Sequence, residues 1–162
     1  MSVSKDIRFS RNVRGMTELL SGKCVGVAGC GGLGSNAAMA LVRAGVGHLI
    51  LVDQDLVEAS NLNRQCFFEW DVGKPKVEAL AHYLRGVNPE VVLELHHRRL
   101  KAELISELFS GADLLIEAFD VARDKHWLVH GWVKAFPGRP VVAGNGLAGY
   151  GRSSEQIGRA HV

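Results

Sequence analysis

The stretch that decides the fold lies at residues 24–35 and reads CVGVAGCGGLGS. Its apolar part, residues 25–28, has the length and composition of a short buried strand. This strand leads into three glycines at Gly-x-Gly-x-x-Gly spacing, Gly29, Gly31 and Gly34. In such a loop the first glycine permits a tight turn, the second lets the backbone approach a phosphate, and the third lets a helix pack against the strand. The stretch therefore predicts a phosphate-binding turn at a helix N-terminus.

The residues after this turn complete a βαβ unit. The sequence predicts a helix over residues 32–44, and a second apolar run, residues 49–52, ends on Asp53. We expect this helix to pack through Leu33, Ala37, Ala40, Leu41 and Ala44. An acid at the end of the second strand commonly accepts hydrogen bonds from ribose hydroxyls. The flanking elements and Asp53 make the pattern a much stronger indication of nucleotide binding than the glycine spacing alone.

Strands and helices continue to alternate along the chain. We expect further strands at residues 91–95, 114–117 and 140–144, and helices after Pro75, at 102–109 and at 125–135. This alternation predicts an α/β fold, Rossmann-like and doubly wound, with a mostly parallel sheet and helices on both faces. Asp53 and Asp120 would then lie at carboxyl ends of strands, the edge at which such sheets bind ligands.

Composition bounds the class of protein. The chain has 162 residues, enough for one compact domain, and it is 47% hydrophobic and 22% charged. Its net charge of +2 gives no reason to expect a nucleic acid or a membrane as partner. The first six residues lack the apolar core of a signal peptide, and no apolar run reaches the length of about 20 residues that a bilayer requires. We therefore expect a cytoplasmic protein.

The cysteines and histidines do not form a recognisable metal or thiol site. The three cysteines are an odd, sparse set without a Cys-x-x-Cys pair, which fits a reducing compartment. No histidine is placed by sequence to activate Cys30 or Cys66. His126 and His130 are four residues apart and could share a ligand, but no further ligand is placed beside them. We expect no zinc site.

Two further features stand close to the βαβ unit. A polar loop carries Asp55, Asn61, Asn63, Arg64 and Gln65, which by itself is typical of a capped turn with a surface arginine. Lys76 falls in the first turn of the next helix, the end at which the helix dipole disfavours a cation unless an anion lies there. Such a departure from a local rule is a mild indication of function.

Four motifs follow one another in the chain: GCGGLGS at 29–35, DQD at 53–55, SNLNRQ at 60–65 and GKPK at 73–76. Together they resemble the adenylating enzymes that activate ubiquitin-like proteins, most closely the ThiF branch, which adenylates the sulfur carrier of thiamine biosynthesis. The molybdopterin branch is closely related. Residues 11–13 also look like the N-terminal arginine motif of this family. The resemblance covers roughly residues 8–150 and is far more specific than the glycine loop alone.

The resemblance implies roles for individual residues. Cofactor-binding roles are implied for Gly29, Gly31, Gly32, Gly34, Asp53, Asp55, Asn61, Arg64, Gln65 and Lys76, and catalytic roles for Arg64, Lys76, Asp120 and Arg11. The glycines would hold the phosphates of ATP, Asp53 its ribose, and Asp120 would lie at or near Mg²⁺. The substrate would be a small carrier protein ending in Gly-Gly, whose terminal carboxylate attacks the α-phosphate and releases pyrophosphate. Arg11 would reach the site of a neighbouring subunit, which implies a homodimer.

The sequence departs from the family in two respects. It lacks the zinc-binding cysteine pairs of many relatives, and it stops soon after the fifth expected strand. The ending IGRAHV resembles a translated library adapter, so we expect a truncated fragment that could be inactive. We therefore divide the chain into an N-terminal solvated arm with a short helix at 1–22, an ATP-binding adenylation domain at 23–152 and a non-native tail at 153–162.

Three other functions remain open from the sequence. A NAD-dependent oxidoreductase would use the glycine loop and Asp53 to bind the dinucleotide, but this function does not explain the presence of Arg64 and Lys76. A tRNA-modifying branch of the same superfamily would activate a carboxylate on a modified base, and the net charge supports this only weakly. A non-catalytic scaffold is disfavoured because Arg64, Lys76 and Asp120 are all retained.

Overall fold

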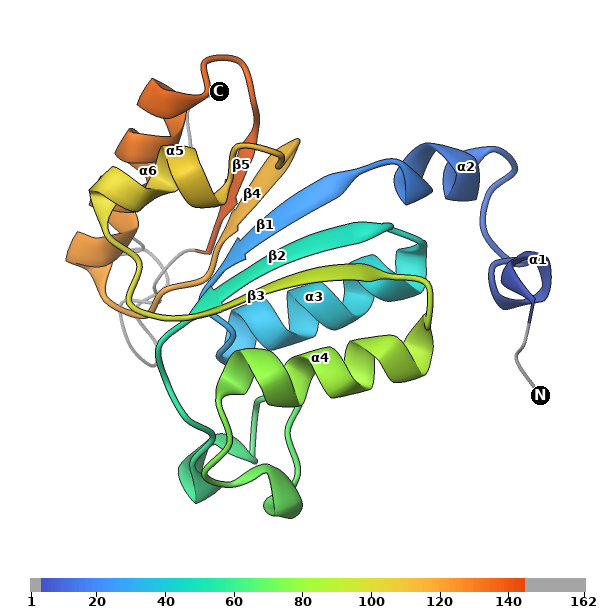
Figure 1. The fold of residues 1–162 in the computed structure, drawn as a ribbon, viewed down its shortest axis with the longest axis horizontal. Helices are drawn as coiled ribbons and strands as arrows, with labels where there is room; N and C mark the ends of the chain where they lie inside the picture. The colour runs from blue at the N-terminus through green and yellow to red at the C-terminus, as the bar shows by residue number, and fades with distance from the viewer. Residues whose placement is uncertain (1–3, 145–162) are drawn as a thin grey trace, which may run out of the picture.

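A computed structural model describes residues 4–144 of the chain. Its sheet consists of β1 (Cys24–Ala28), β2 (His48–Asp53), β3 (Val92–His97), β4 (Leu114–Glu117) and β5 (Val141–Ala143). All neighbouring strands pair in parallel, in the order β3-β2-β1-β4-β5 (Figure 1). The order reverses between β1 and β4, which confirms the predicted doubly wound, Rossmann-like sheet.

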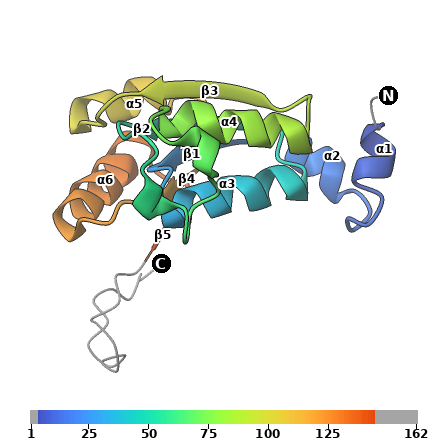
Figure 2. The same ribbon diagram turned by 90° about the horizontal axis from the view of Figure 1, so that it is seen from below.

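Helices cover both faces of this sheet. The α-helices are α1 (Lys5–Arg8), α2 (Met16–Ser21), α3 (Gly32–Ala44), α4 (Lys76–Val87), α5 (Ile105–Leu108) and α6 (Ala122–Ala135), and the 3₁₀ turns are η1 (Ala59–Asn61), η2 (Glu69–Asp71) and η3 (Ala102–Leu104). Helices α3 and α4 lie side by side on one face, whereas α5 and α6 lie on the other near β4 and β5 (Figures 1 and 2). Within residues 4–144, no helix is both long and apolar enough to cross a membrane.

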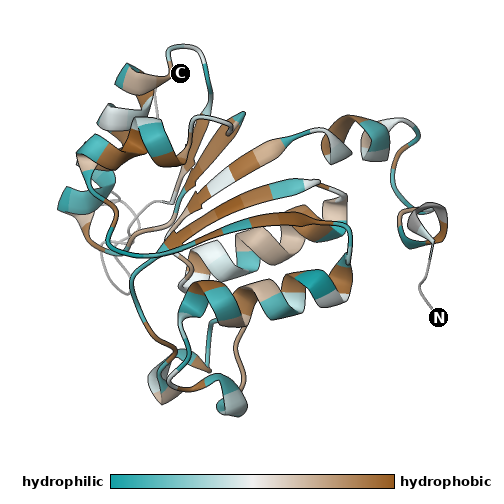
Figure 3. Ribbon diagram, in the orientation of Figure 1, coloured by the Kyte–Doolittle hydropathy of each residue, from teal (hydrophilic) through white to brown (hydrophobic). Residues whose placement is uncertain are grey.

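Two hydrophobic cores result, one on each face of the sheet. Every residue of β1 is buried, as expected of a central parallel strand covered on both sides. Gly26 in this strand leaves room for Phe109, because a Cβ there would lie 2.6 Å from the Phe109 ring. Figure 3 shows the apolar residues concentrated along the strands between the two helical layers.

The predicted packing face of the helix at 32–44 is only partly right: Leu41 packs against the core, but Leu33 and Ala40 are exposed. Leu33 is 55% exposed, and the buried residues are Gly34, Ser35, Ala38 and Val42. The physical reason is the close approach of the helix to the glycine turn: a Cβ at Gly34 would lie 1.7 Å from the Gly29 carbonyl oxygen. Only small side chains fit that contact, so the first turn of this helix is buried through Gly34 and Ser35 and not through Leu33.

The N-terminal segment is less solvated than the sequence predicts. Phe9 is buried, and the Arg8 guanidinium donates a hydrogen bond of 2.9 Å to the Asn88 side-chain oxygen. The Asn12 amide donates to the Ala44 carbonyl oxygen, also at 2.9 Å. These contacts hold the segment against the ends of α3 and α4, at the amino-terminal edge of the sheet. The expected tail at 153–162 lies outside the described residues.

Candidate functional site

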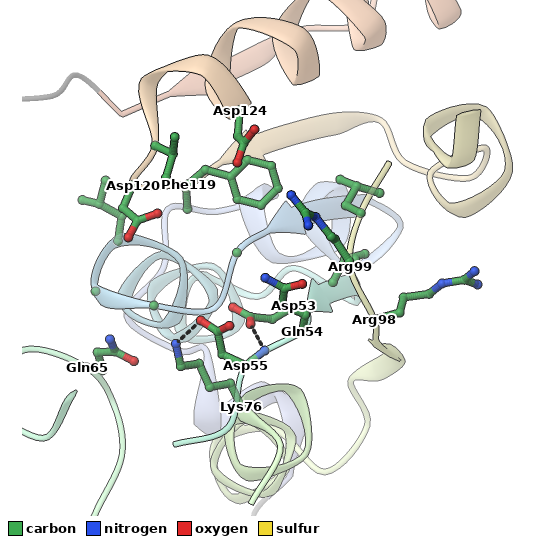
Figure 4. Close-up of a pocket in the computed structure, with 18 of the residues that line it drawn as sticks. Asp53, Gln54, Asp55, Gln65, Lys76, Arg98, Arg99, Phe119, Asp120 and Asp124 are labelled. Carbon is green, nitrogen blue, oxygen red and sulfur yellow. Dashed lines mark hydrogen bonds and ion pairs between the residues drawn. The ribbon is translucent and has the colours of Figure 1, made fainter. Parts of the chain in front are cut away.

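An open cavity lies at the carboxyl-terminal edge of the sheet, where the strand order reverses (Figure 4). Its volume is about 1030 Å³, and it is lined by the loops that follow β1, β2, β3 and β4. Open α/β sheets bind ligands at this position, since the loops diverge there and leave a crevice. We refer to it as the carboxyl-edge cavity.

The glycine loop, residues 29–34, forms one wall of this cavity. Gly29 has a φ of 93°, and a Cβ there would lie 2.9 Å from the Ala118 carbonyl oxygen, so the turn requires glycine on both counts. Gly31 is the N-cap of α3, and no side chain caps this helix. The first N–H groups of α3 therefore have no side-chain acceptor, which suits them to bind an anion.

Asp53 joins the glycine loop to the loop after β2. One of its carboxylate oxygens accepts a hydrogen bond of 2.6 Å from the Cys30 N–H, and the other accepts one of 2.7 Å from the Asp55 N–H. Burial raises the pKa of Asp53, although these two hydrogen bonds oppose the shift. Each oxygen keeps a second lone pair and Asp53 lines the cavity, so its carboxylate can still accept the predicted hydrogen bond from a ribose hydroxyl.

Lys76 is a buried cation at the first position of α4. It is 6% exposed, and its Nζ lies 2.8 Å from Oδ2 of Asp55. The Asp55 carboxylate is therefore the nearby anion that offsets the unfavourable position of the Lys76 cation at a helix N-terminus. Because Asp55 is half exposed and both residues line the carboxyl-edge cavity, Lys76 can also attract an anion from the cavity side.

The polar loop at 60–65 contributes three side chains. Arg64 is exposed, and its Nη1 donates to the Ser60 carbonyl oxygen at 3.0 Å and to Asn63 at 2.9 Å. Asn61 is buried and accepts the Glu58 N–H, so part of its role is to cap η1. Gln65 lies against Gly31, and among residues 4–144 its buried side-chain oxygen has no hydrogen-bond partner. A ligand that donates a hydrogen bond would satisfy that oxygen.

Asp120 follows β4 and lines the opposite wall, with an exposed carboxylate (Figure 4). The described residues contain no cluster of three or more His, Cys, Asp or Glu side chains that could hold a metal ion. Mg²⁺ does not need one, because it commonly binds through one or two carboxylates together with the phosphates of a substrate. The donor set of this wall fits a phosphate-bound Mg²⁺.

Arg11 is the one predicted site residue that the fold keeps far from the cavity. It is exposed in the segment between α1 and α2, at the amino-terminal edge of the sheet (Figure 1). The carboxyl-edge cavity lies at the other edge, and Arg11 does not line it. Within one chain the two cannot meet, so its predicted role requires a second copy and stays a prediction.

Sequence reasoning missed the residues after β3. Arg98, Arg99 and Leu100 line the cavity, and Figure 4 shows Arg99 directed inward and Arg98 directed away. The signal was available: these residues follow a strand, and the rule that loops at carboxyl ends bind ligands applies to them as it does to Asp53. The strand was expected to end at residue 95, but it continues to His97, which brings the basic residues to the edge.

The free thiols lack the features of a reactive cysteine. Burial raises the pKa of the Cys30 thiol, and the Asp53 carboxylate raises it further. Cys66 donates a hydrogen bond to the Asn36 side-chain oxygen at 3.3 Å. His126 and His130 are exposed and stack on each other, with ring centroids 6.4 Å apart.

Comparison with protein families and curated proteins finds clear relatives. The model of the ThiF family matches residues 4–158. A SAMP-activating enzyme E1 of Haloferax volcanii is 39% identical over 145 residues, which cover 85% of this chain and 53% of that enzyme. An adenylyltransferase and sulfurtransferase, uba4 of Aspergillus niger, is 36% identical over 136 residues, with coverages of 83% and 28%. The chain thus spans about half the length of one relative and less than a third of the other.

Solved structures show the same fold. The tRNA N6-threonylcarbamoyladenosine dehydratase TcdA of E. coli, in complex with ATP, superposes with a TM-score of 0.82 at 29% identity, covering 91% of this chain and 63% of that one. E. coli MccB with ATP gives a TM-score of 0.72 at 28% identity, with coverages of 81% and 39%. Both similar structures were determined with ATP.

Proposed function

The chain belongs to the ThiF family, and from this premise we propose that it binds ATP in the carboxyl-edge cavity and adenylates the C-terminal glycine of a ubiquitin-like carrier protein. One observation carries the proposal: the uncapped N-terminus of α3, Arg64 and Lys76 line the same cavity. All three favour a polyphosphate. The ATP complexes of two similar structures support the choice of nucleotide.

The chemistry follows from the charges involved. The carrier's carboxylate oxygen attacks the α-phosphorus, a new P–O bond forms, and the bond to the bridging oxygen breaks to release pyrophosphate. The attacking carboxylate is ionised at neutral pH, so no general base is needed. Attack of one anion on another requires nearby cations, which Arg64 supplies as a planar fork and Lys76 as a compact charge. Positioning and charge neutralisation then account for the rate.

Mg²⁺ bound to the phosphates would further neutralise charge on the polyphosphate and on the leaving pyrophosphate. Asp120 would hold it, since its carboxylate is exposed at the cavity and lies on the turn that packs against the glycine loop. The contribution of the chain is to fix the position of this carboxylate on the turn between β4 and α6.

The nucleoside would occupy the other half of the cavity. Asp53 is placed between the glycine loop and the loop after β3, as expected for a ribose-binding acid. Beyond it the lining becomes apolar and basic, with Leu100, Phe119 and Arg99. A purine base is flat and apolar on its faces, so this lining suits it.

We propose a carrier that ends in Gly-Gly, and specifically the sulfur carrier of thiamine biosynthesis. The names of two relatives, a SAMP-activating enzyme and an adenylyltransferase and sulfurtransferase, are compatible with activation of a small carrier. We also propose that the protein acts as a homodimer in which Arg11 of a second copy completes the site, because residues 11–13 resemble the N-terminal arginine motif of the family and Arg11 does not line the cavity of its own chain.

A second candidate function is activation of a carboxylate on a modified tRNA base. Two observations favour it: the similarity to a tRNA-modifying dehydratase, and three exposed basic residues, Arg98, Arg99 and Lys101, at the mouth of the cavity. Basic side chains at a cavity mouth would contact RNA phosphates.

Pyrophosphate exchange into ATP separates the two candidates. We expect exchange when a carrier with a free Gly-Gly terminus is added, and none with the same carrier lacking its last glycine. Exchange that needs tRNA and ignores the carrier would favour the second candidate. Transfer of hydride to NAD, without exchange under any condition, would refute both.

A further inference from the structure

A buried ion pair lies directly behind the turn that carries Asp120. Glu117 is the last residue of β4, and its side chain has no exposed surface. The ammonium group of Lys125, in α6, lies 3.1 Å from one of its carboxylate oxygens and 3.2 Å from the other. Neither residue lines the carboxyl-edge cavity, so neither is placed to touch a nucleotide.

The same carboxylate also holds the backbone next to Asp120. Its Oε1 accepts a hydrogen bond of 2.7 Å from the Phe119 N–H. At the same end of this turn, the Ala118 N–H donates to the Ala28 carbonyl oxygen at 2.9 Å. At the other end, the Lys125 N–H donates to the Val121 carbonyl oxygen at 3.1 Å. The turn between β4 and α6 is therefore fastened at both ends, and Asp120 stands at its centre.

Asp120 itself has no such anchor. Its carboxylate is exposed, and in the part of the chain that the structure describes it makes no hydrogen bond or ion pair. Its position depends on the backbone, and the backbone depends on Glu117. The turn also packs on the glycine loop, since a Cβ at Gly29 would lie 2.9 Å from the Ala118 carbonyl oxygen. A shift of this turn would thus change the distance between Asp120 and any anion bound by the glycine loop.

Stability alone is a weak reason for a buried ion pair. Desolvation of both charges offsets most of their attraction, and apolar residues of similar volume commonly serve the fold as well or better. A role in holding one defined geometry accounts better for charges at this place.

We propose that Glu117 and Lys125 are positioning residues that hold Asp120 where it can bind the Mg²⁺ of a nucleotide complex. The inference rests on the proposed ATP-binding function. It predicts that the ion pair strengthens ATP binding more in the presence of Mg²⁺ than in its absence, because the contact of Asp120 with the metal exists only in the former case.

The test is calorimetric titration of ATP into the full chain, once with Mg²⁺ and once with EDTA. The quantity of interest is the ratio of the two dissociation constants. Mg²⁺ should tighten ATP binding, and we expect Asp120→Asn to reduce this ratio of dissociation constants by about tenfold, because it removes one charge-assisted contact. Lys125→Met should lower it to the same degree, with a smaller loss of metal-free affinity than of affinity in the presence of Mg²⁺. Lys125→Arg keeps the cation and should restore the ratio.

A single loss of Lys125 leaves a buried charge and could prevent folding. The variant Glu117→Leu with Lys125→Met removes both charges and also the oxygen that accepts the Phe119 N–H, so it should fold, as apolar replacements of buried ion pairs commonly do, and still show the lowered ratio. A wild-type ratio in this double variant, alongside a lowered ratio in Asp120→Asn, would overturn the positioning role. Equal weakening of metal-free and metal-bound ATP would overturn it as well. Wild-type protein that binds no ATP would instead refute the proposed function on which the inference rests.

Discussion

Lys76 is a cation in a place that two physical effects disfavour. It is 6% exposed, so desolvation acts against its charge, and it stands at the positive end of the α4 dipole. Asp55 compensates for both, at 2.8 Å from Nζ. A residue held charged at this cost, on the wall of a cavity that also contains the N-terminus of α3, is suited to bind an anion that carries more than one charge.

Replacement of Lys76 by methionine should weaken ATP binding by about 10- to 100-fold, because a charge-assisted hydrogen bond contributes about 1.5–3 kcal/mol. The fold should tolerate the change, since Asp55 is half exposed and can be solvated when its partner is lost. Lys74→Met is the matched control: Lys74 is also paired with an aspartate, Asp71 at 3.1 Å, but does not line the carboxyl-edge cavity. Calorimetry that finds equal affinities for the two variants would exclude Lys76 from the site.

Arg98 and Arg99 offer a comparison between neighbours. Of the two, only Arg99 is directed into the cavity, towards the side of Phe119 (Figure 4). If Arg99 lies over the nucleobase, Arg99→Ala should weaken ATP binding about fivefold, the effect of a cation–π contact of about 1 kcal/mol. Arg98→Ala should change it little, and binding of inorganic triphosphate should be the same in both variants. A loss of triphosphate binding in Arg99→Ala would instead assign Arg99 to the phosphates.

At the scale of elements, the contact between α3 and the glycine turn defines the phosphate-binding wall. Gly34→Ala should destabilise the protein by at least about 2 kcal/mol, because the added Cβ would lie 1.7 Å from the Gly29 carbonyl oxygen and the helix must move away. Gly86→Ala, in α4, is the control: a Cβ there meets nothing within 4 Å and should stabilise the helix by about 0.5–1 kcal/mol. Urea unfolding of both variants measures these free energies, and a stable Gly34→Ala protein would contradict the structure.

The junction of β1 with the turn before β4 gives a pH-dependent prediction. The Cys24 N–H donates a hydrogen bond of 2.9 Å to Asp113, and this bond lowers the pKa of the Asp113 carboxyl, with Lys23 acting in the same direction. A folded-state pKa below the unfolded one means that the carboxylate stabilises the fold above the unfolded pKa of about 3.9, and that this stability is lost as the pH falls through the folded pKa. Asp113→Asn should therefore be less stable than the wild type at pH 7, and this deficit should become smaller at about pH 3, below the unfolded pKa. Urea unfolding at both pH values tests this; a deficit that is equally large at low pH would assign it to something other than ionisation.

Elements differ in how far the sequence predicted them. The β1 strand, the glycine turn and the acid after β2 were predictable, because each follows a local rule of burial, backbone freedom or chain order. The buried face of α3 was not, since the choice between Leu33 and Gly34 depends on the distance to Gly29, which sequence spacing does not contain. The rule of chain order also covers Arg99, which follows β3, but the strand was expected to end two residues too early, so Arg99 was not assigned to the cavity.

At the scale of the whole molecule, the two cores fix the cavity between them. Helices α3 and α4 bury one face of the sheet and α5 and α6 the other, so the loops from both layers meet where the strand order reverses. Arg64 and Lys76 come from one layer, and Asp120 comes from the other. The proposed chemistry needs all of them around one polyphosphate, and no element alone could provide that.

The most direct test of this account is a crystal structure of the protein with Mg²⁺ and a non-hydrolysable ATP analogue. We expect the phosphates to lie against residues 29–34, within hydrogen-bond distance of Arg64 and Lys76, with the ribose at Asp53. An analogue bound elsewhere, or one whose phosphates point into solvent away from Arg64 and Lys76, would contradict the account.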